Sequence, residues 1–202
     1  VLTERGAIVT NDRGQTNVAG VWAAGDVNGR SMLAHTAYRE GEVCINNILG
    51  IRDSVNYAAI PSVIYTNPEV AAVGETEESA KAKGLDVIVK TVTLKLSGRY
   101  IAENEGGNGV IKLIIGREHK DILGVHMIGT YASEIIYGCA MMVDRHMRVG
   151  DVQRTVFPHP TVGEVLREAM FGITGAAASR LLPTNIRTQA AEAEMNIKTI
   201  LE

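Results

Sequence analysis

The sequence predicts an α+β fold in which helices pack on an antiparallel sheet. Strand-like segments gather between residues 61 and 128, and the longest helical patterns stand before and after them, a segregation typical of α+β domains. Turn residues, rather than helices, separate the last strands, as antiparallel neighbours allow. Hydrophobic residues make up 46% of the chain and charged residues 21%, which is enough apolar material for a buried core.

The first 54 residues contain two short strand signals and one helical pattern. Two strands are too few for an independent sheet, so we expect this part to be the closing segment of another domain. A turn at 11–14 separates the strands, and Gly50 is a plausible stop for the helix. The predicted elements are strands at 7–10 and 21–24 and a helix from Met32 to Leu49.

Residues 55–172 are predicted to form the domain that carries the sheet. A C-terminal extension follows over 173–202, with an Ala-rich stretch and a helix predicted from Gln189 to Leu201, for which the sequence offers no function. Within 55–172 we expect strands at 63–65, 70–73, 87–94, 109–115 and 122–128, and helices from Thr76 to about Gly84, from Ala132 to Met147 and from Pro160 through Met170.

Charge and hydropathy argue against two classes of partner. The 20 Lys and Arg residues form no long basic run and the net charge is −3, so we expect no nucleic-acid binding. No apolar stretch reaches the roughly 18 residues that cross a bilayer, and no signal peptide opens the sequence, so we expect a cytoplasmic protein that does not enter a membrane. The first residue is Val1, which fits processing or a sequence that begins within a longer protein.

Cysteine and histidine spacing argues against a metal site. Cys44 and Cys139 lie far apart, each in an apolar helical stretch, and are expected to be buried core thiols. The remaining histidines, at 119, 126 and 146, have no ligand-like spacing. We therefore expect no bound metal.

The first candidate for chemistry is the strand-to-loop junction that ends at Gly25 and Asp26. A carboxylate just past a strand can accept hydrogen bonds from ligand hydroxyls, and small neighbouring residues let a ligand approach the backbone. The helix that follows, at Met32-Leu33-Ala34-His35, can direct its N-terminal amides at the same ligand. The alternative is that Asp26 is a turn residue that caps a helix.

The second candidate is His159, which has a proline on each side. The prolines stiffen the backbone, and Glu164 follows within reach of the imidazole. A histidine oriented by a carboxylate is a common general base near neutral pH. The alternative is structural: Thr161 and Glu164 match a capping box, and His159 is then a turn residue.

The order of these segments resembles the pyridine-nucleotide disulfide oxidoreductase family. The stretches 21–27, 32–37 and 40–41 look like its second FAD motif, 61–74 looks like the entry to its dimerisation domain, and His159-Pro160-Thr161 with Glu164 looks like its active-site histidine motif. Within the family the chain is most similar to the C-terminal part of the dihydrolipoamide dehydrogenases. The segments that carry this similarity are 32–35, 97–100 and 124–129.

The resemblance implies roles for these residues. His159 would take a proton from a dihydrolipoyl thiol, Glu164 would orient it, and the His159–Pro160 peptide would be cis. In the family this histidine serves the flavin and disulfide of the other subunit, so the resemblance implies a homodimer, with a lipoyl-bearing protein and NAD as further partners. The cofactor implied is FAD, of which this chain would hold only part of the site, through Gly25, Asp26, Met32, Leu33, Ala34, His35 and Pro160.

Two parts of the family pattern do not occur in the sequence. There is no G-x-G-x-x-G first FAD motif and no redox-active C-x-x-x-x-C pair, so the chain is expected to be inactive by itself. Two alternatives remain open at this stage. One is a dimerisation module without catalysis, and the other is the same part of a glutathione or mercuric reductase.

Overall fold

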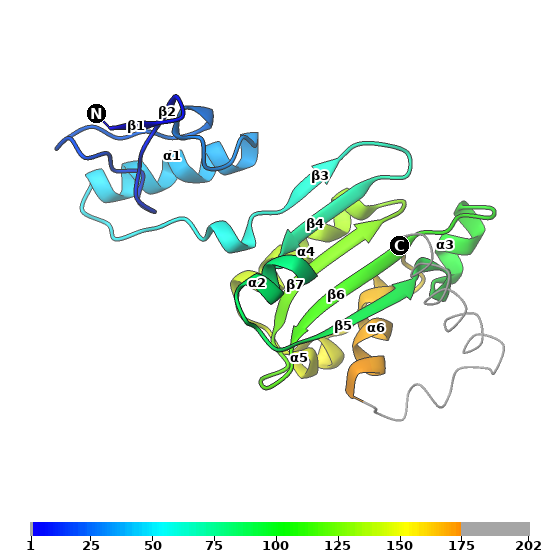
Figure 1. The fold of residues 1–202 in the computed structure, drawn as a ribbon. Helices are drawn as coiled ribbons and strands as arrows, with labels where there is room; N and C mark the ends of the chain where they lie inside the picture. The colour runs from blue at the N-terminus through cyan, green and yellow to red at the C-terminus, as the bar shows by residue number, and fades with distance from the viewer. Residues whose placement is uncertain (1, 175–202) are drawn as a thin grey trace. The chain divides into compact units, whose positions relative to one another are not determined.

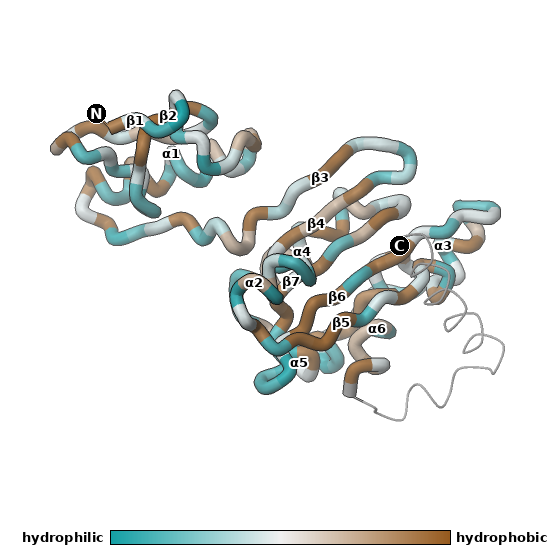
Figure 2. Tube along the Cα trace, in the orientation of Figure 1, coloured by the Kyte–Doolittle hydropathy of each residue, from teal (hydrophilic) through white to brown (hydrophobic). Residues whose placement is uncertain are grey.

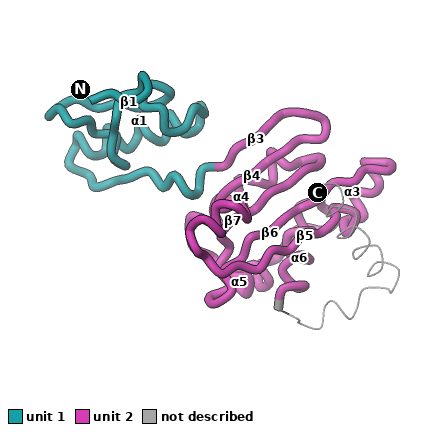
Figure 3. The backbone as a smooth tube through the Cα atoms, viewed as in Figure 1, with its two compact units in different colours: residues 1–60 teal, residues 61–202 magenta. Residues whose placement is uncertain are grey.

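The computed structural model describes residues 2–174 and consists of two compact units (Figure 3). The first is Val1–Ile60, and the second begins at Pro61. The helix predicted from Gln189 to Leu201 lies outside the described residues.

The first unit is organised around one amphipathic helix, α1 (Ala34–Ile48). Its buried residues recur at helical spacing and include Val43, Cys44 and the charged Glu40. The strand predicted at 21–24 is wrong: the backbone there makes one isolated bridge, between Gln15 and Trp22, because no continuous strand runs alongside it. The other elements are β1 (Thr3–Glu4), β2 (Ala7–Ile8), η1 (Asp26–Asn28) and η2 (Tyr57–Ala59).

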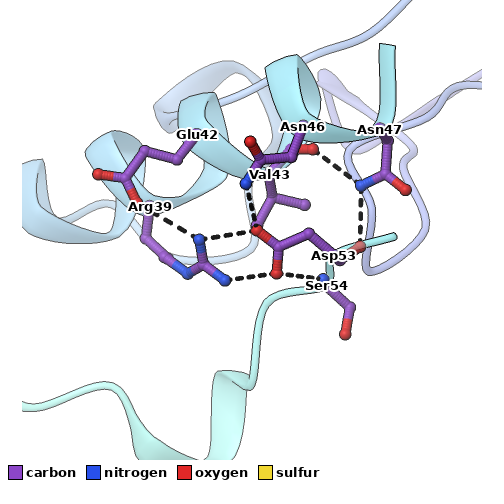
Figure 4. Close-up of polar contacts among 7 residues, drawn as sticks. All are labelled: Arg39, Glu42, Val43, Asn46, Asn47, Asp53 and Ser54. Atoms are coloured by element: carbon purple, nitrogen blue, oxygen red, sulfur yellow. Dashed lines mark hydrogen bonds and ion pairs between the residues drawn. The ribbon is translucent and has the colours of Figure 1, made fainter. Parts of the chain in front are cut away.

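The segment after α1 folds back onto the helix through Asp53 (Figure 4). The Arg39 guanidinium donates to both Asp53 carboxylate oxygens, at 2.5 and 2.9 Å. Asn46 Nδ2 donates to Oδ2 and Asn47 Nδ2 donates to the Asp53 carbonyl, both at 2.8 Å. Gly50 makes the reversal possible, since its φ of +81° is a region that favours glycine.

We expect Asp53→Asn to destabilise the protein at neutral pH and to lose this effect in acid. Hydrogen bonds from Arg39 and then Asn46 lower the pKa of Asp53 to about 2, below its unfolded value of about 3.9. The charged carboxylate therefore stabilises the fold above about pH 4, and this contribution is lost as the pH falls towards 2. Thermal unfolding of the wild type and of Asp53→Asn between pH 2 and 7 measures the difference in their stability. A difference that does not change with pH would contradict the prediction.

The second unit confirms the predicted α+β fold, with a five-stranded sheet in which every neighbouring pair is antiparallel. The strand order is β3-β4-β7-β6-β5, so the last strand in sequence, β7, lies at the centre. The strands are β3 (Ser62–Ile64), β4 (Val70–Gly74), β5 (Val87–Thr93), β6 (Val110–Gly116) and β7 (Ile122–Ile128).

Two of the longer helices cover one face of this sheet (Figure 1). The long α4 (Ala132–Asp144) lies over β4 and β7, and α6 (Glu164–Thr174) lies over β5 and β6. Hydrophobic residues concentrate along the central strands (Figure 2). The core side chains on the covered face alternate along each strand, as a sheet buried on one side requires. They include Ala71, Val73, Ile111, Leu113, Val125 and Met127, with Ile136, Cys139, Val165, Leu166 and Met170 from the helices.

The opposite face of the sheet carries polar side chains among apolar ones. Lys112 and His126 lie directly opposite each other on β6 and β7. Lys112 Nζ donates to Glu77 Oε1 at 2.7 Å, and His126 Nε2 is 2.9 Å from the Glu75 carbonyl oxygen. These contacts tie α2 (Glu77–Ala82) and the residues before it to this face.

Three short helices of the second unit were not predicted: η3 (Leu94–Leu96), α3 (Gly98–Glu103) and α5 (Val149–Arg154). Six residues are too few for a helix that is stable by itself, so α3 and α5 depend on side-chain caps and packing. Ser97 Oγ accepts a hydrogen bond from the Tyr100 amide, and the Asp151 carboxylate accepts one from the Arg148 amide. Neither contact produces a visible periodic pattern in sequence.

Candidate active site and cofactor-binding residues

The loop between α5 and α6 carries His159. The His159–Pro160 peptide is cis, as predicted. The Thr161 hydroxyl donates to the Pro158 carbonyl at 2.8 Å, which closes the loop on itself. The predicted helix start at Pro160 is wrong: α6 begins at Glu164, because residues 158–163 form this closed loop instead of a first helical turn.

His159 and Glu164 are in contact. His159 Nδ1 is 2.8 Å from Glu164 Oε2. The Glu164 side chain is 16% exposed, whereas that of His159 is 79% exposed, so a largely buried carboxylate holds an imidazole that faces outward. The capping-box alternative does not form, because Thr161 lies outside α6 and its hydroxyl bonds to Pro158. With Nδ1 at the carboxylate, Nε2 is the ring nitrogen available for proton transfer.

Ser97 anchors the same loop from a distant part of the sequence. Its hydroxyl is fully buried and donates to the Thr161 carbonyl at 2.8 Å. Next to it, Val162 and Val165 are 3% and 1% exposed and fix both ends of the turn into α6. Sequence reasoning missed Ser97 as a site residue. A serine just before Gly98-Arg99-Tyr100 indicates a helix cap, but nothing in the sequence indicates its bond to Thr161.

We expect Ser97→Ala to lower the free energy of unfolding by about 1–3 kcal/mol, because it removes the hydrogen bond to the partly buried Thr161 carbonyl and the cap of α3. Urea unfolding measures the change. Ser62→Ala is a matched control, since Ser62 is exposed and its hydroxyl bond is long, 3.5 Å to the Ala72 carbonyl. Equal stability of the two variants would contradict a role for Ser97 in holding the loop.

In the first unit, Gly25 and Asp26 lie in a tight turn before α1. Gly25 is buried with φ +81°, and a Cβ there would come within 3.3 Å of Ala37 Cβ on α1. Asp26 is exposed and begins η1. No side chain caps η1 or α1, so Asp26 is not a helix cap, which was the alternative prediction.

The start of α1 fits a ligand that carries hydroxyl and carbonyl groups. Leu33 is the residue at the N-terminal boundary of α1, and no side chain caps the helix there, as its own apolar side chain cannot. Met32 is 71% exposed beside it, and Ala34 and His35 are exposed too. Asn28 Nδ2, one turn from Asp26, is buried without a hydrogen-bond partner among the described residues. These features suit FAD, whose ribityl chain and ring edge offer such groups.

The cysteines are core thiols, as predicted. Cys139 is fully buried and Cys44 is 7% exposed. Burial raises the pKa of Cys139 to about 12 and also raises that of Cys44, so both stay protonated and unreactive at neutral pH. Over residues 2–174 no three His, Cys, Asp or Glu side chains are grouped as metal ligands. No helix in that range combines the length and apolar character needed to cross a membrane.

Comparison with curated proteins gives relatives along most of the chain. It is 38% identical over 177 residues to a dihydrolipoyl dehydrogenase of Rhizobium etli, which covers 87% of this chain and 37% of that protein. It is also 38% identical over 164 residues to a mitochondrial dihydrolipoyl dehydrogenase of Pisum sativum, covering 81% of this chain and 32% of the pea protein. The chain therefore spans about a third of the length of these relatives.

A solved structure shares the fold of this chain, and two family models match its sequence. LpdA from Mycobacterium tuberculosis matches the fold with a TM-score of 0.79 at 23% identity, covering 86% of this chain and 38% of that one. Residues 1–41 match the pyridine nucleotide-disulphide oxidoreductase model, and residues 60–170 match the dimerisation-domain model of the same name. The second match takes in the whole sheet and the His159–Glu164 pair, and the chain belongs to the pyridine nucleotide-disulphide oxidoreductase family.

Proposed function

We propose that this chain is the C-terminal part of a dihydrolipoyl dehydrogenase, an enzyme that transfers electrons from protein-bound dihydrolipoyl groups to NAD+. The single observation that carries the proposal is the contact between His159 Nδ1 and Glu164 Oε2 at 2.8 Å. Relatives from Rhizobium etli and Pisum sativum named as dihydrolipoyl dehydrogenases, each 38% identical to this chain, support the choice of substrate.

In this proposal His159 is the catalytic base. Glu164 accepts a hydrogen bond from Nδ1–H and stabilises the imidazolium, and Nε2 takes the proton from a dihydrolipoyl thiol. The resulting thiolate attacks the redox-active disulfide of the intact enzyme, forms a mixed disulfide and releases one disulfide sulfur as a thiolate. Cys44 and Cys139 are buried in separate units, so neither supplies that disulfide.

The residues of the first unit hold part of FAD, which when bound carries electrons from the reduced disulfide to NAD+. The Asp26 carboxylate would accept hydrogen bonds from the ribityl hydroxyls. Met32, Leu33, Ala34 and His35 provide apolar contacts and main-chain amides at the start of α1, and Gly25 lets the loop approach the helix closely. We place Pro160, beside the catalytic histidine, on the FAD of the other subunit.

The working enzyme in this proposal is a homodimer in which His159 serves the flavin and disulfide of the other subunit. The 79% exposure of the His159 side chain in a single chain supports this, since a second subunit can then complete its surroundings. The chain by itself holds neither the disulfide nor a complete FAD site and is inactive. We place the intact enzyme in the cytoplasm, with a lipoyl-bearing protein as its substrate.

A subunit complementation experiment tests the proposal. Two full-length subunits are co-expressed with different tags, one carrying His159→Gln and the other lacking the redox disulfide. If His159 acts across the dimer, the purified heterodimer has one complete site and about half the wild-type turnover of dihydrolipoamide with NAD+. Activity no higher than that of the two inactive homodimers would overturn the proposed sharing of the site.

The wild-type enzyme also decides between substrates. Turnover of dihydrolipoamide should exceed that of glutathione disulfide or mercuric ion by orders of magnitude. A preference for either of the latter would assign the chain to another member of the family. Absence of turnover with all three would support a dimerisation module without catalysis.

A further inference from the structure

Glu40 is a buried carboxylate on α1 with two neutral partners. It is 1% exposed, and each oxygen accepts one hydrogen bond: Oε2 from the Gly25 amide at 2.5 Å and Oε1 from the Tyr57 hydroxyl at 2.6 Å. Burying an ionisable group is costly unless its hydrogen-bonding capacity is used, so a glutamate at this position has a specific role to fulfil. Burial and the neighbouring Glu40 raise the pKa of Tyr57, which keeps its hydroxyl a donor.

Gly25 begins the loop that carries Asp26 and ends at Arg30, and Tyr57 also contacts the Arg30 end of this loop. The Arg30 guanidinium stacks on the Tyr57 ring, 3.8 Å from its centre. The guanidinium also donates to Asp12 Oδ1 at 2.7 Å, and the Arg30 amide donates to Asn28 Oδ1 at 2.9 Å. The loop from Gly25 to Arg30 is thus tied to one tyrosine at both ends, through Glu40 at the first residue and by direct stacking at the last.

We propose that Glu40 and Tyr57 are positioning residues for the flavin: they fix the loop on which Asp26 meets the ribityl chain. This inference rests on the proposed function. An exposed carboxylate on a free loop would lose conformational entropy on binding, and a loop already tied at both ends avoids that loss. Neither residue needs to touch FAD, because Glu40 holds the Gly25 amide and Tyr57 acts through Glu40 and the Arg30 side chain.

Tyr57 also lies in the segment that leads to Pro61, where the second unit begins. The Asp26 loop and the order of this connecting segment therefore depend on each other. Because such coupling is reciprocal, FAD binding should stabilise the folded arrangement of residues 56–60 by the same free energy by which that arrangement favours FAD binding.

The test measures FAD affinity of the full-length apoprotein by flavin fluorescence titration. Tyr57→Phe removes the hydrogen bond from Tyr57 to the buried Glu40, and Glu40→Leu removes the acceptor of both the Gly25 amide and the Tyr57 hydroxyl. Each change should raise the dissociation constant of FAD about tenfold or more. Glu40→Gln keeps an acceptor for the Gly25 amide and should lose less. Glu42→Gln and Tyr38→Phe are matched controls, since both side chains are exposed on the same helix. They should bind FAD like the wild type.

A double variant separates positioning from a general loss of structure. If Glu40 acts through Asp26, then Glu40→Gln combined with Asp26→Ala binds FAD no more weakly than Asp26→Ala does. Additive losses would overturn the positioning role. Should Glu40→Leu not fold, Tyr57→Phe decides by the same comparison, with FAD affinity equal to that of Tyr38→Phe as the overturning result.

The two proposals fail in different ways. If Asp26→Ala leaves FAD affinity unchanged, the cofactor assignment is wrong and the positioning role falls with it. If Asp26→Ala weakens FAD but the Glu40 and Tyr57 variants bind like their controls, only the positioning role is wrong.

Discussion

Replacing His159 by glutamine in the full-length protein is expected to lower turnover by about 10²–10⁴-fold while FAD remains bound. Glutamine has no group that accepts a proton at neutral pH, so the dihydrolipoyl thiol must ionise without help. The residues that we assign to the ribityl chain are on the first unit, and Pro160, which we place on FAD from the second unit, is unchanged in this variant, so flavin content should not change. Steady-state rates with dihydrolipoamide and NAD+, together with the flavin absorbance of the purified protein, measure both effects.

Two further variants define what this result means. Glu164→Gln keeps a hydrogen-bond acceptor for His159 Nδ1 but removes the charge that stabilises the imidazolium. This variant should therefore lose turnover, but less than His159→Gln does. His119→Gln is the matched control, because His119 is an exposed turn residue with a long 3.8 Å contact to Glu118. A His159→Gln enzyme as fast as the His119→Gln enzyme would remove His159 as the base.

The sheet was predictable because its signal is local. The strand predicted at 122–128 matches β7 residue for residue, and those predicted at 70–73 and 109–115 match β4 and β6 to within one residue at each end. Each of these segments is a short run rich in apolar residues, and turn residues at 106–108 and 119–121 bound the last two in sequence. The order of the strands was not predictable, since β7 inserts between β4 and β6 through pairings that no short pattern specifies.

The candidate site was predictable only where its partners are neighbours in sequence. His159 and Glu164 are five residues apart, and their contact was one of two alternatives that the sequence offered. Ser97 lies 64 residues from Thr161, and Glu40 lies 15 and 17 residues from Gly25 and Tyr57. Contacts of this kind appear only once the chain is folded. The sequence analysis therefore found Asp26 and His159 but missed Ser97, Glu40 and Tyr57, which hold their loops.

The largest effect on stability is expected from Gly74→Ala. Gly74 ends β4 with φ +80°, and a Cβ there would lie 2.1 Å from the Leu123 carbonyl oxygen of the neighbouring segment. Backbone atoms cannot move aside as a side chain can, and the left-handed conformation is itself unfavourable for alanine. We expect the free energy of unfolding to fall by about 4 kcal/mol or more, a large part of the total stability of an ordinary domain.

Gly150→Ala separates this effect from the loss of a glycine as such. Gly150 lies in α5, where the nearest atom to a new Cβ is the flexible end of Arg154 at 3.7 Å, and alanine favours a helix by about 0.5–1 kcal/mol. Urea unfolding should therefore show the control unchanged or slightly stabilised. If Gly74→Ala were as stable as the Gly150→Ala control, β4 and β7 would separate at this point at little cost in free energy. In that case the pairing of Gly74 with Gly124 would not be what fixes the central strand, and the position of α4 over both strands would have to depend on its own core contacts.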